Sequence, residues 1–238
     1  MSNNLRWKSL PPLMRGRPAR LAAIARRRLL RARLAARMAG PVTRRALDIA
    51  VALAGLVLAA PFLLLAVVCI KLGSAGPVFF RQERVGLRGR IFSIWKLRTM
   101  VSSAEDDKEH LAASHPAMDG PRFKLERDPR VTASGRFLRR FSIDELPQFL
   151  NVIVGDMTLI GPRPPLWSEV VEYDARALRR LEVAPGLTCL WQVRGRSDLS
   201  FDAQVALDLE YIDRVKVGGE LRILFDTIPA VLTGRGAY

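Results

Sequence analysis

The sequence predicts a helix-rich α+β protein that meets a membrane through one apolar segment and carries a small soluble domain behind it. Residues 49–70 are 22 consecutive positions without a charged side chain. A helix of that length just crosses a hydrocarbon core of about 30 Å. A buried helix of a soluble protein would show a polar face, which this run lacks. From residue 73 onwards the chain is long enough to form one modest hydrophobic core.

Pro61 lies near the middle of the apolar run, where it removes one backbone donor and pushes its ring into the preceding turn. Arg44 and Arg45 precede the run, and Lys71 follows it. Positive flanks favour the cytoplasmic side of a membrane, so both ends favour the same side. A hairpin that enters the bilayer, bends at Pro61 and returns satisfies both flanks. A single span with a tolerated proline is an equal alternative on these residues alone.

The positive charge is concentrated at the start of the chain. Residues 1–48 hold 13 of the 38 Lys and Arg residues against one acid, Asp48, and so carry +12 of the net charge of +15. A basic arm beside an apolar run fits anionic lipid headgroups better than it fits nucleic acid. The two cysteines, Cys69 and Cys189, indicate neither a disulfide framework nor a metal site.

Two short strands are predicted within residues 78–100, with Gly86 and Gly89 in the turn between them. Strand alternation places Lys96 and Arg98 on the same face at the end of the second strand. Two cations in this position either protect a solvated edge or contribute to a site for an anion.

The polar residues 101–128 contain both histidines, His110 and His115, and are predicted to form a solvated loop rather than a metal site. Residues 161–165 (GPRPP) form a stiff loop that fixes the direction of Arg163. The other predicted elements are a helix over 135–141, a capping box at 142–145 that opens a second helix ending at Gly155, a charged helix over 168–182, a strand or loop over 189–196, a helix over 201–216, and an amphipathic helix over 221–232 that Pro229 interrupts.

Asp144 and Glu145 carry the strongest chemical signal. Acids in the first turn of a helix often only stabilise its dipole, and this structural role is one interpretation of the pair. The other follows from the cations of the chain, because two carboxylates among fixed cations suit phosphoryl transfer. One carboxylate can attack phosphorus, while the second holds Mg²⁺ or accepts a proton. The cations concerned are Lys96, Arg98, Arg136, Arg139, Arg140 and Arg163.

Five segments, in order along the chain, resemble the monotopic phosphoglycosyl transferases, also named the bacterial sugar transferase family. The resemblance covers roughly residues 44–238, and the segment around Asp144 is its most specific part. One departure is Ala60, because many relatives carry a serine before the proline that breaks the membrane helix. The segments are LDIAVALAGLVLAAPFLLL, GPVFFRQERVGLRGRIFSIWKLRTM, DPRVTASGRFLRRFSIDELPQFLNVIVGDMTLIGPRPP, PGLTCLWQVRGR and LRILFDTIPAVLTGRGAY.

Composition at the start of the chain and the resemblance over the rest together divide the chain into three regions. These are a basic, flexible juxtamembrane arm over residues 1–43, a re-entrant membrane helix over 44–72 broken at Pro61, and a cytosolic catalytic domain over 73–238. The resemblance thereby favours the hairpin over the single span. It also implies interfacial amphipathic helices and a location at the bacterial inner membrane, with the catalytic domain facing the cytoplasm.

The resemblance further implies a reaction. Members of the family transfer a sugar 1-phosphate from a UDP-sugar to undecaprenyl phosphate and release UMP, and short members start exopolysaccharide assembly. Asp144 aligns with the nucleophile that forms a covalent phosphosugar intermediate, and Glu145 with a residue that helps to bind Mg²⁺. The residues expected around the phosphates are Lys96, Arg98, Arg139, Arg140 and Arg163, and those expected at the nucleotide or sugar are Gln192 and Arg196.

The expected partners are therefore a UDP-sugar of glucose or galactose, undecaprenyl phosphate and anionic membrane lipids, but no nucleic acid. A homodimer is left open. The alternative function is a non-enzymatic membrane-anchored protein that binds anionic lipid or nucleic acid through the arginine-rich arm.

Overall fold

The computed structural model describes residues 41–101, 103–104, 128–214, 217–234 and 236 of the chain. Contacts divide the chain into two units, Met1–Arg44 and Arg45–Tyr238. Residues 1–40 of the predicted basic arm lie outside the described residues, as do His110 and His115.

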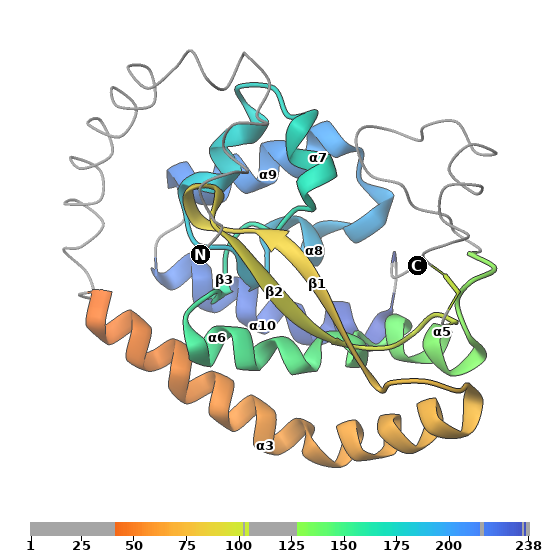
Figure 1. Cartoon of the computed structure of the whole chain (residues 1–238). Helices are drawn as coiled ribbons and strands as arrows, with labels where there is room; N and C mark the ends of the chain where they lie inside the picture. Colours follow the sequence, from red (N-terminus) through yellow and green to blue (C-terminus); the bar gives the residue numbers. More distant parts are fainter. Residues whose placement is uncertain (1–40, 102, 105–127, 215–216, 235, 237–238) are drawn as a thin grey trace, which may run out of the picture. The chain divides into compact units, whose positions relative to one another are not determined.

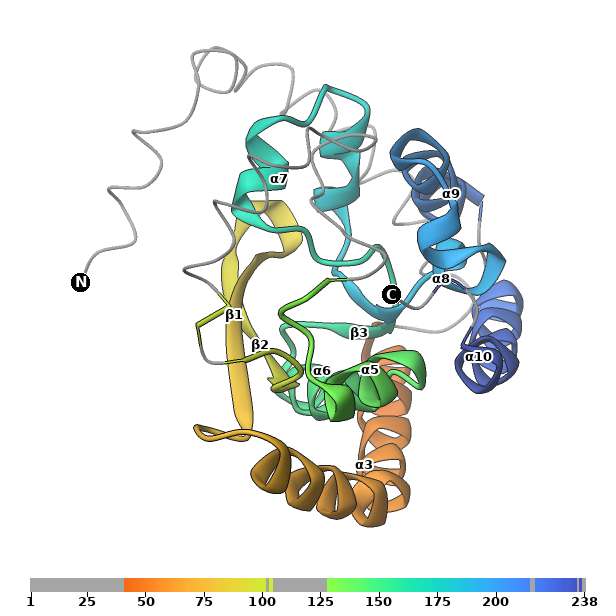
Figure 2. The same ribbon diagram turned by 90° about the vertical axis from the view of Figure 1, so that its right-hand side faces the viewer.

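Helix α3 (Pro41–Gly73) is the predicted membrane segment. Within the described residues it is the one helix that is long and apolar enough to cross a membrane. The helix is continuous through Pro61, whereas the sequence predicted a break there. A proline removes only its own N–H donor, so the helical ladder can resume on both sides of it. Figures 1 and 2 show the result as a helix whose axis bends near its middle.

One face of α3 packs against the domain. Asp48, Ala52, Ala59, Ala66 and Ile70 are each at most 7 % exposed, and their spacing places them along one side of a helix. The small alanines let the domain approach the helix closely. The opposite face stays apolar and open, with the following residues all more than half exposed: Val57, Leu58, Phe62, Leu64 and Leu65.

The predicted hairpin is confirmed. Strand β1 (Phe79–Val85) pairs with β2 (Ile91–Leu97) in antiparallel register, and Phe80 lies opposite Lys96. The turn between the strands includes the single-turn helix η2 (Leu87–Gly89). A second, parallel pair joins β3 (Thr158–Ile160) to β4 (Gly186–Thr188), and the sequence did not predict it.

Helices make up most of the remaining described domain, which confirms the helix-rich α+β class. They are α5 (Ala133–Arg140), η3 (Ile143–Gln148), α6 (Phe149–Val154), α7 (Trp167–Val171), η4 (Ala177–Glu182), α8 (Leu190–Arg194), η5 (Arg196–Asp198), α9 (Phe201–Arg214) and α10 (Val217–Thr233).

Three predicted elements need correction. The helix expected over 168–182 is divided into α7 and η4, because the side chain of Asp174 accepts a hydrogen bond from Ala177 N and starts a new turn. The segment 189–196 contains helix α8, which buries Leu190 and Trp191, rather than a strand or loop. Helix α10 continues through Pro229, as α3 does through Pro61.

The main hydrophobic core fixes the elements that carry the site. Its buried side chains come from strands and helices far apart in the sequence, so β2, α6 and β3 are held against α8, α9 and α10. Because β2 ends in Lys96 and Leu97, and α6 directly follows η3, the core sets where these two segments meet. The members include Ile94, Val152, Met157, Leu190, Tyr211 and Ile223.

Candidate active site

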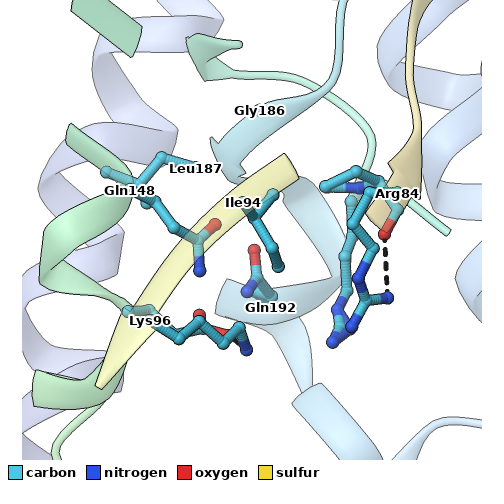
Figure 3. A pocket seen from close by; sticks show the side chains of 10 residues that line it. Arg84, Ile94, Lys96, Gln148, Gly186, Leu187 and Gln192 are labelled. Carbon is cyan, nitrogen blue, oxygen red and sulfur yellow. Dashed lines mark hydrogen bonds and ion pairs between the residues drawn. The ribbon is translucent and has the colours of Figure 1, made fainter. Parts of the chain in front are cut away.

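A pocket lies where β2 faces η3, between the loop after β3 and the start of α8. The empty space within it is about 240 Å³ and includes open solvent. Figure 3 shows Lys96 and Gln148 approaching from one side and Arg84 from the other, with Gln192 between them. The lining residues are Arg84, Ile94, Lys96, Glu145, Gln148, Arg163, Pro164, Gly186, Leu187 and Gln192.

Lys96 and Glu145 form an ion pair on the wall of this pocket. Lys96 Nζ lies 2.7 Å from Glu145 Oε1, and the side chains are only 15 % and 25 % exposed. Burial alone would raise the pKa of Glu145, but Lys96, Arg163 and Arg84 together lower it to about 2. Glu145 is therefore ionised throughout the physiological pH range.

Asp144 lies next to this pair in a drier place. It is 6 % exposed and is not among the residues that line the pocket. Burial raises the pKa of Asp144, Lys96 opposes this rise, Glu145 adds to it, and Arg139 also opposes it. The adjacent carboxylates thus differ in pKa, one raised and one lowered, as expected where two acids take different roles.

The chain places this pair through a tight turn rather than through the predicted capping box. Ser142 adopts a left-handed conformation (φ 53°), and its side chain makes no capping hydrogen bond. Instead Glu145 N donates to the main-chain carbonyl of Ser142 at 3.2 Å. The sharp entry after α5 makes η3 a 3₁₀ helix, and Gly155 (φ 102°) ends the following α6 as predicted.

Arg84 is a pocket residue that was not among the predicted site residues. It is 5 % exposed, with Nη2 donating to Gln82 Oε1 at 2.6 Å and Nη1 donating to Pro164 O at 3.2 Å. Val85 N also donates to Pro165 O at 2.9 Å. Strand β1 therefore holds the loop that carries Arg163. Strand alternation was the available signal, since Arg84 and Lys96 share one face of the hairpin.

The other predicted phosphate ligands lie outside the pocket lining. Arg98 donates to the carbonyls of Ser74 and Ala75 at 2.7 and 2.8 Å, so its guanidinium holds the end of α3. Arg139 Nε donates to Thr99 Oγ1 at 2.9 Å, and its charge still acts on Asp144. Arg140 is exposed, and its guanidinium carbon lies 5.6 Å from the ring centroid of Phe141.

Of the two residues predicted at the nucleotide or sugar, Gln192 lines the pocket and Arg196 does not. Cys189 Sγ donates to Gln192 Oε1 at 3.1 Å, which orients the Gln192 amide. Burial raises the pKa of Cys189 well above its usual value, so the thiol keeps its proton. Arg196 has a left-handed backbone (φ 52°), and its buried Nη1 has no hydrogen-bond partner among the described residues.

Two arginines tie both ends of the membrane helix to the domain. Arg45 donates to the carbonyls of Val152 and Ile153 at 2.6 and 2.8 Å, at the C-terminal end of α6. Arg98 binds the residues that follow Gly73 at the other end, as described above. Both ends of α3 are therefore fixed within one domain, close to the segments that carry Glu145 and Lys96.

The carboxylates can also be tested as a metal site. Within the residues that the structure describes, no group of three or more His, Cys, Asp or Glu side chains could hold a metal ion. Asp144 and Glu145 supply two carboxylates, and one oxygen of Glu145 is bound to Lys96. This donor set fits Mg²⁺ bound by one or two carboxylates plus substrate phosphates and water, but does not fit a cage made by protein alone.

Cations surround an ionised carboxylate on a domain that carries one long apolar helix, and this arrangement suits phosphate chemistry. Residues 39–234 match the family described as bacterial sugar transferase. The chain belongs to this family and is an enzyme of the sugar-phosphate transferase class. The family membership favours the predicted enzyme over the non-enzymatic alternative.

Three curated relatives illustrate the similarity. The chain is 44 % identical over 197 residues to galactosyl transferase CpsE of Streptococcus agalactiae, covering 82 % of this chain and 43 % of the relative. It is 40 % identical over 207 residues to exopolysaccharide production protein ExoY of Rhizobium meliloti, covering 86 % and 92 %. It is 42 % identical over 212 residues to UDP-glucose:undecaprenyl-phosphate glucose-1-phosphate transferase of Caulobacter vibrioides, covering 85 % and 74 %. The chain thus spans less than half of one relative and nearly all of another.

Proposed function

We propose that this protein transfers a hexose 1-phosphate from a UDP-sugar to undecaprenyl phosphate and releases UMP, as the first membrane step of exopolysaccharide or related glycoconjugate assembly. The observation that carries the proposal is the ionised Glu145 held by Lys96 at 2.7 Å, beside the buried Asp144 and facing Arg84 and Arg163. A diphosphate donor needs cations fixed in advance, and such cations stabilise the charge that develops during phosphoryl transfer. The printed name of the Caulobacter relative supports the donor and the acceptor.

In the proposed route Asp144 acts as the nucleophile. Its carboxylate oxygen forms a bond to the phosphorus that carries the sugar, and the bond from that phosphorus to the bridging oxygen breaks, so UMP leaves. An oxygen of undecaprenyl phosphate then attacks the same phosphorus and forms the lipid diphosphate, which frees Asp144. Two steps at one site allow the soluble donor and the lipid acceptor to react in turn.

The cations have distinct roles in this scheme. Lys96 keeps Glu145 ionised, while Arg84 and Arg163 face the space where the diphosphate would bind. Glu145 would hold Mg²⁺ together with the donor phosphates, and Mg²⁺ when bound would neutralise part of the diphosphate charge. Gln192, oriented by Cys189, would donate a hydrogen bond from its amide nitrogen to the UDP-sugar. We do not assign Arg98 or Arg140 to the phosphates, because the carbonyls of Ser74 and Ala75 bind Arg98 and the guanidinium of Arg140 lies near the ring of Phe141.

The proposal places the active site at the cytoplasmic surface of the bacterial inner membrane, with α3 re-entering rather than spanning. Arg45 and Arg98 fix both ends of α3 to one domain, whereas a spanning helix would put its ends about 30 Å apart on opposite sides of the bilayer. Helices α5, α6 and α10 lie at the end of the domain nearest α3 (Figures 1 and 2). An apolar face of α10 is exposed there and fits an interfacial helix, with its residues at helical spacing: Leu221, Phe225, Ile228 and Leu232.

The test is UMP release by the full chain in lipid nanodiscs, with undecaprenyl phosphate, Mg²⁺ and a panel of UDP-sugars. We expect release with UDP-glucose or UDP-galactose, and at least a 100-fold loss in Asp144→Asn and Glu145→Gln. Arg222→Gln is the matched control, because Arg222 is an exposed residue of α10 outside the pocket. No UMP from any UDP-sugar, with folded protein and acceptor present, would refute the proposed function.

A further inference from the structure

Asn151 joins the separate segments that carry the site, and the proposed reaction gives it no role. It lies in α6 and is 2 % exposed. Its side-chain oxygen accepts a hydrogen bond from Trp95 N at 3.1 Å, and its side-chain nitrogen donates to Ser93 O at 2.8 Å. The amide thus pairs with the edge of β2 in the way that the peptide of a neighbouring strand would.

The main chain of Asn151 makes a second connection. Its carbonyl oxygen accepts from the N–H groups of Gly155, Asp156 and Met157 at 3.1, 3.0 and 3.2 Å. These bonds end α6 and turn the chain towards β3 (Thr158–Ile160). The loop that carries Arg163 follows β3 directly, so Asn151 also sets where this loop begins.

The groups of the site depend on these connections. Lys96 follows Trp95 in β2, and Glu145 lies in η3, which runs without interruption into α6. The 2.7 Å contact between Lys96 and Glu145 requires that β2 does not shift along η3 and α6. Among the described residues of α6, Asn151 is the one whose side chain forms hydrogen bonds with the main chain of β2.

We infer that Asn151 is a positioning residue that fixes the register of β2 against η3–α6, and thereby the distance between Lys96 and the Asp144–Glu145 pair. This inference rests on the proposed function, because it assigns Asn151 a part in the same reaction. A buried, fully bonded amide could instead contribute only to stability. The two roles differ in what an isosteric replacement does when the pH changes.

Asn151→Asp separates the two roles. An ionised carboxylate accepts from Trp95 N but faces the carbonyl of Ser93 with a second acceptor, so one of the two bonds is lost. A protonated carboxylic acid restores both bonds, because its O–H can donate to Ser93 O. Burial raises the pKa of an aspartate at such a position, so acidification restores the original pairing within an accessible pH range.

The experiment measures UMP release by the full chain in nanodiscs from about pH 5.5 to 8.5, as the ratio of variant to wild type at each pH. Circular dichroism at the same pH values gives the folded fraction, and activity is expressed per folded protein, so that unfolding of the variant is not counted as misplacement of the site. We expect Asn151→Asp to lose about 100-fold at the alkaline end, as for a reacting group misplaced by about 1 Å, and to recover at least tenfold relative to wild type at the acidic end. Val152→Ala is the control, because Val152 is a fully buried core residue of the same helix. Its ratio to wild type should not depend on pH.

Three results would overturn the inference. One is an Asn151→Asp ratio that stays constant across the pH range, and another is full activity at alkaline pH. If Asn151→Asp does not fold at neutral pH, it is prepared and assayed at the acidic end of the range. The third result that would overturn the inference is a variant that is folded but inactive at this acidic pH. Wild type that releases no UMP at all overturns the proposed function itself, which distinguishes that failure from the failure of the positioning role.

Discussion

Replacement of Lys96 by methionine should damage the site in a way that the pH dependence can identify. The substitution keeps most of the apolar stem of Lys96 and removes the charge that lies 2.7 Å from Glu145 Oε1. The pKa of Glu145 is lowered from 4.5 to about 2 by its cations. At 1.36 kcal/mol per unit, this difference corresponds to about 3 kcal/mol of preference for the ionised form. Arg163 and Arg84 supply part of it, so the loss in Lys96→Met is a fraction of that energy.

The sign of the effect follows from the two carboxylates. A depressed pKa on Glu145 contributes stability that is present above pH 4.5 and is lost as the pH falls towards 2. Lys96→Met should therefore be less stable than wild type at pH 7. Between pH 4.5 and 2 it should lose less stability than wild type does. Lys96 also opposes the rise in the pKa of Asp144, so its removal should raise that pKa further. Because the proposed route needs ionised Asp144, the acid limb of UMP release should move to higher pH.

The assay is the pH profile of kcat/KM for UMP release, together with thermal unfolding at each pH. We expect the acid limb of Lys96→Met to shift to higher pH and kcat/KM at pH 8 to fall by about 100-fold. Arg81→Met is the matched control: it removes one cation from the same hairpin, but Arg81 lies outside the pocket lining, with Cζ 3.6 Å from the ring centroid of Trp95. A Lys96→Met profile that parallels wild type at every pH would refute the electrostatic reasoning.

Other substitutions test single contacts. Arg45→Ala removes two charged hydrogen bonds to the end of α6 and should lower the free energy of unfolding by about 1–3 kcal/mol, seen as a lower unfolding temperature in detergent. Arg45→Lys should unfold at a temperature between those of wild type and Arg45→Ala. An unchanged unfolding temperature in Arg45→Ala would contradict the role of Arg45. Cys189→Ser retains a hydrogen-bond donor to Gln192, whereas Cys189→Ala does not. The KM for the UDP-sugar should therefore rise about threefold to tenfold in Cys189→Ala only. Equal KM values in the two variants would show that Cys189 does not orient Gln192. Gly186→Ala would place a β-carbon 2.6 Å from Gly161 O, at the point where β3 and β4 approach each other. The variant should therefore lose about 2–3 kcal/mol of unfolding free energy, measured with urea. A gain in stability would show that the two strands do not approach so closely.

Local patterns predicted the elements that local forces build. The alternation of residues 79–97 and the turn glycines predicted the β1–β2 hairpin, helical spacing predicted α9, and Gly155 predicted the end of α6. The same alternation placed Lys96 on the pocket face of the hairpin. Lys96 and Glu145, predicted to share one site, do form an ion pair. These features depend on side-chain periodicity, which is visible in the sequence.

Features that depend on packing between distant segments could not be predicted in the same way. Strands β3 and β4 have three residues each and lie 25 residues apart, so neither shows a periodicity of its own. Strand alternation places Arg84 on the same face as Lys96, but its hydrogen bond to Pro164 O joins segments 80 residues apart, which no local pattern predicts. Arg98 directly follows β2 and was predicted to share a face with Lys96, yet the carbonyls of Ser74 and Ala75 bind its guanidinium.

The most direct test of the central claim uses the donor without the acceptor. Full-length protein in nanodiscs is incubated with Mg²⁺ and a UDP-sugar labelled in the phosphate attached to the sugar, then digested and analysed by mass spectrometry. The account predicts one equivalent of UMP and a phosphosugar on the peptide that contains Asp144, which is absent from Asp144→Asn and discharged by added undecaprenyl phosphate. Product formation from donor and acceptor together, with no label on Asp144 at any time, would contradict it.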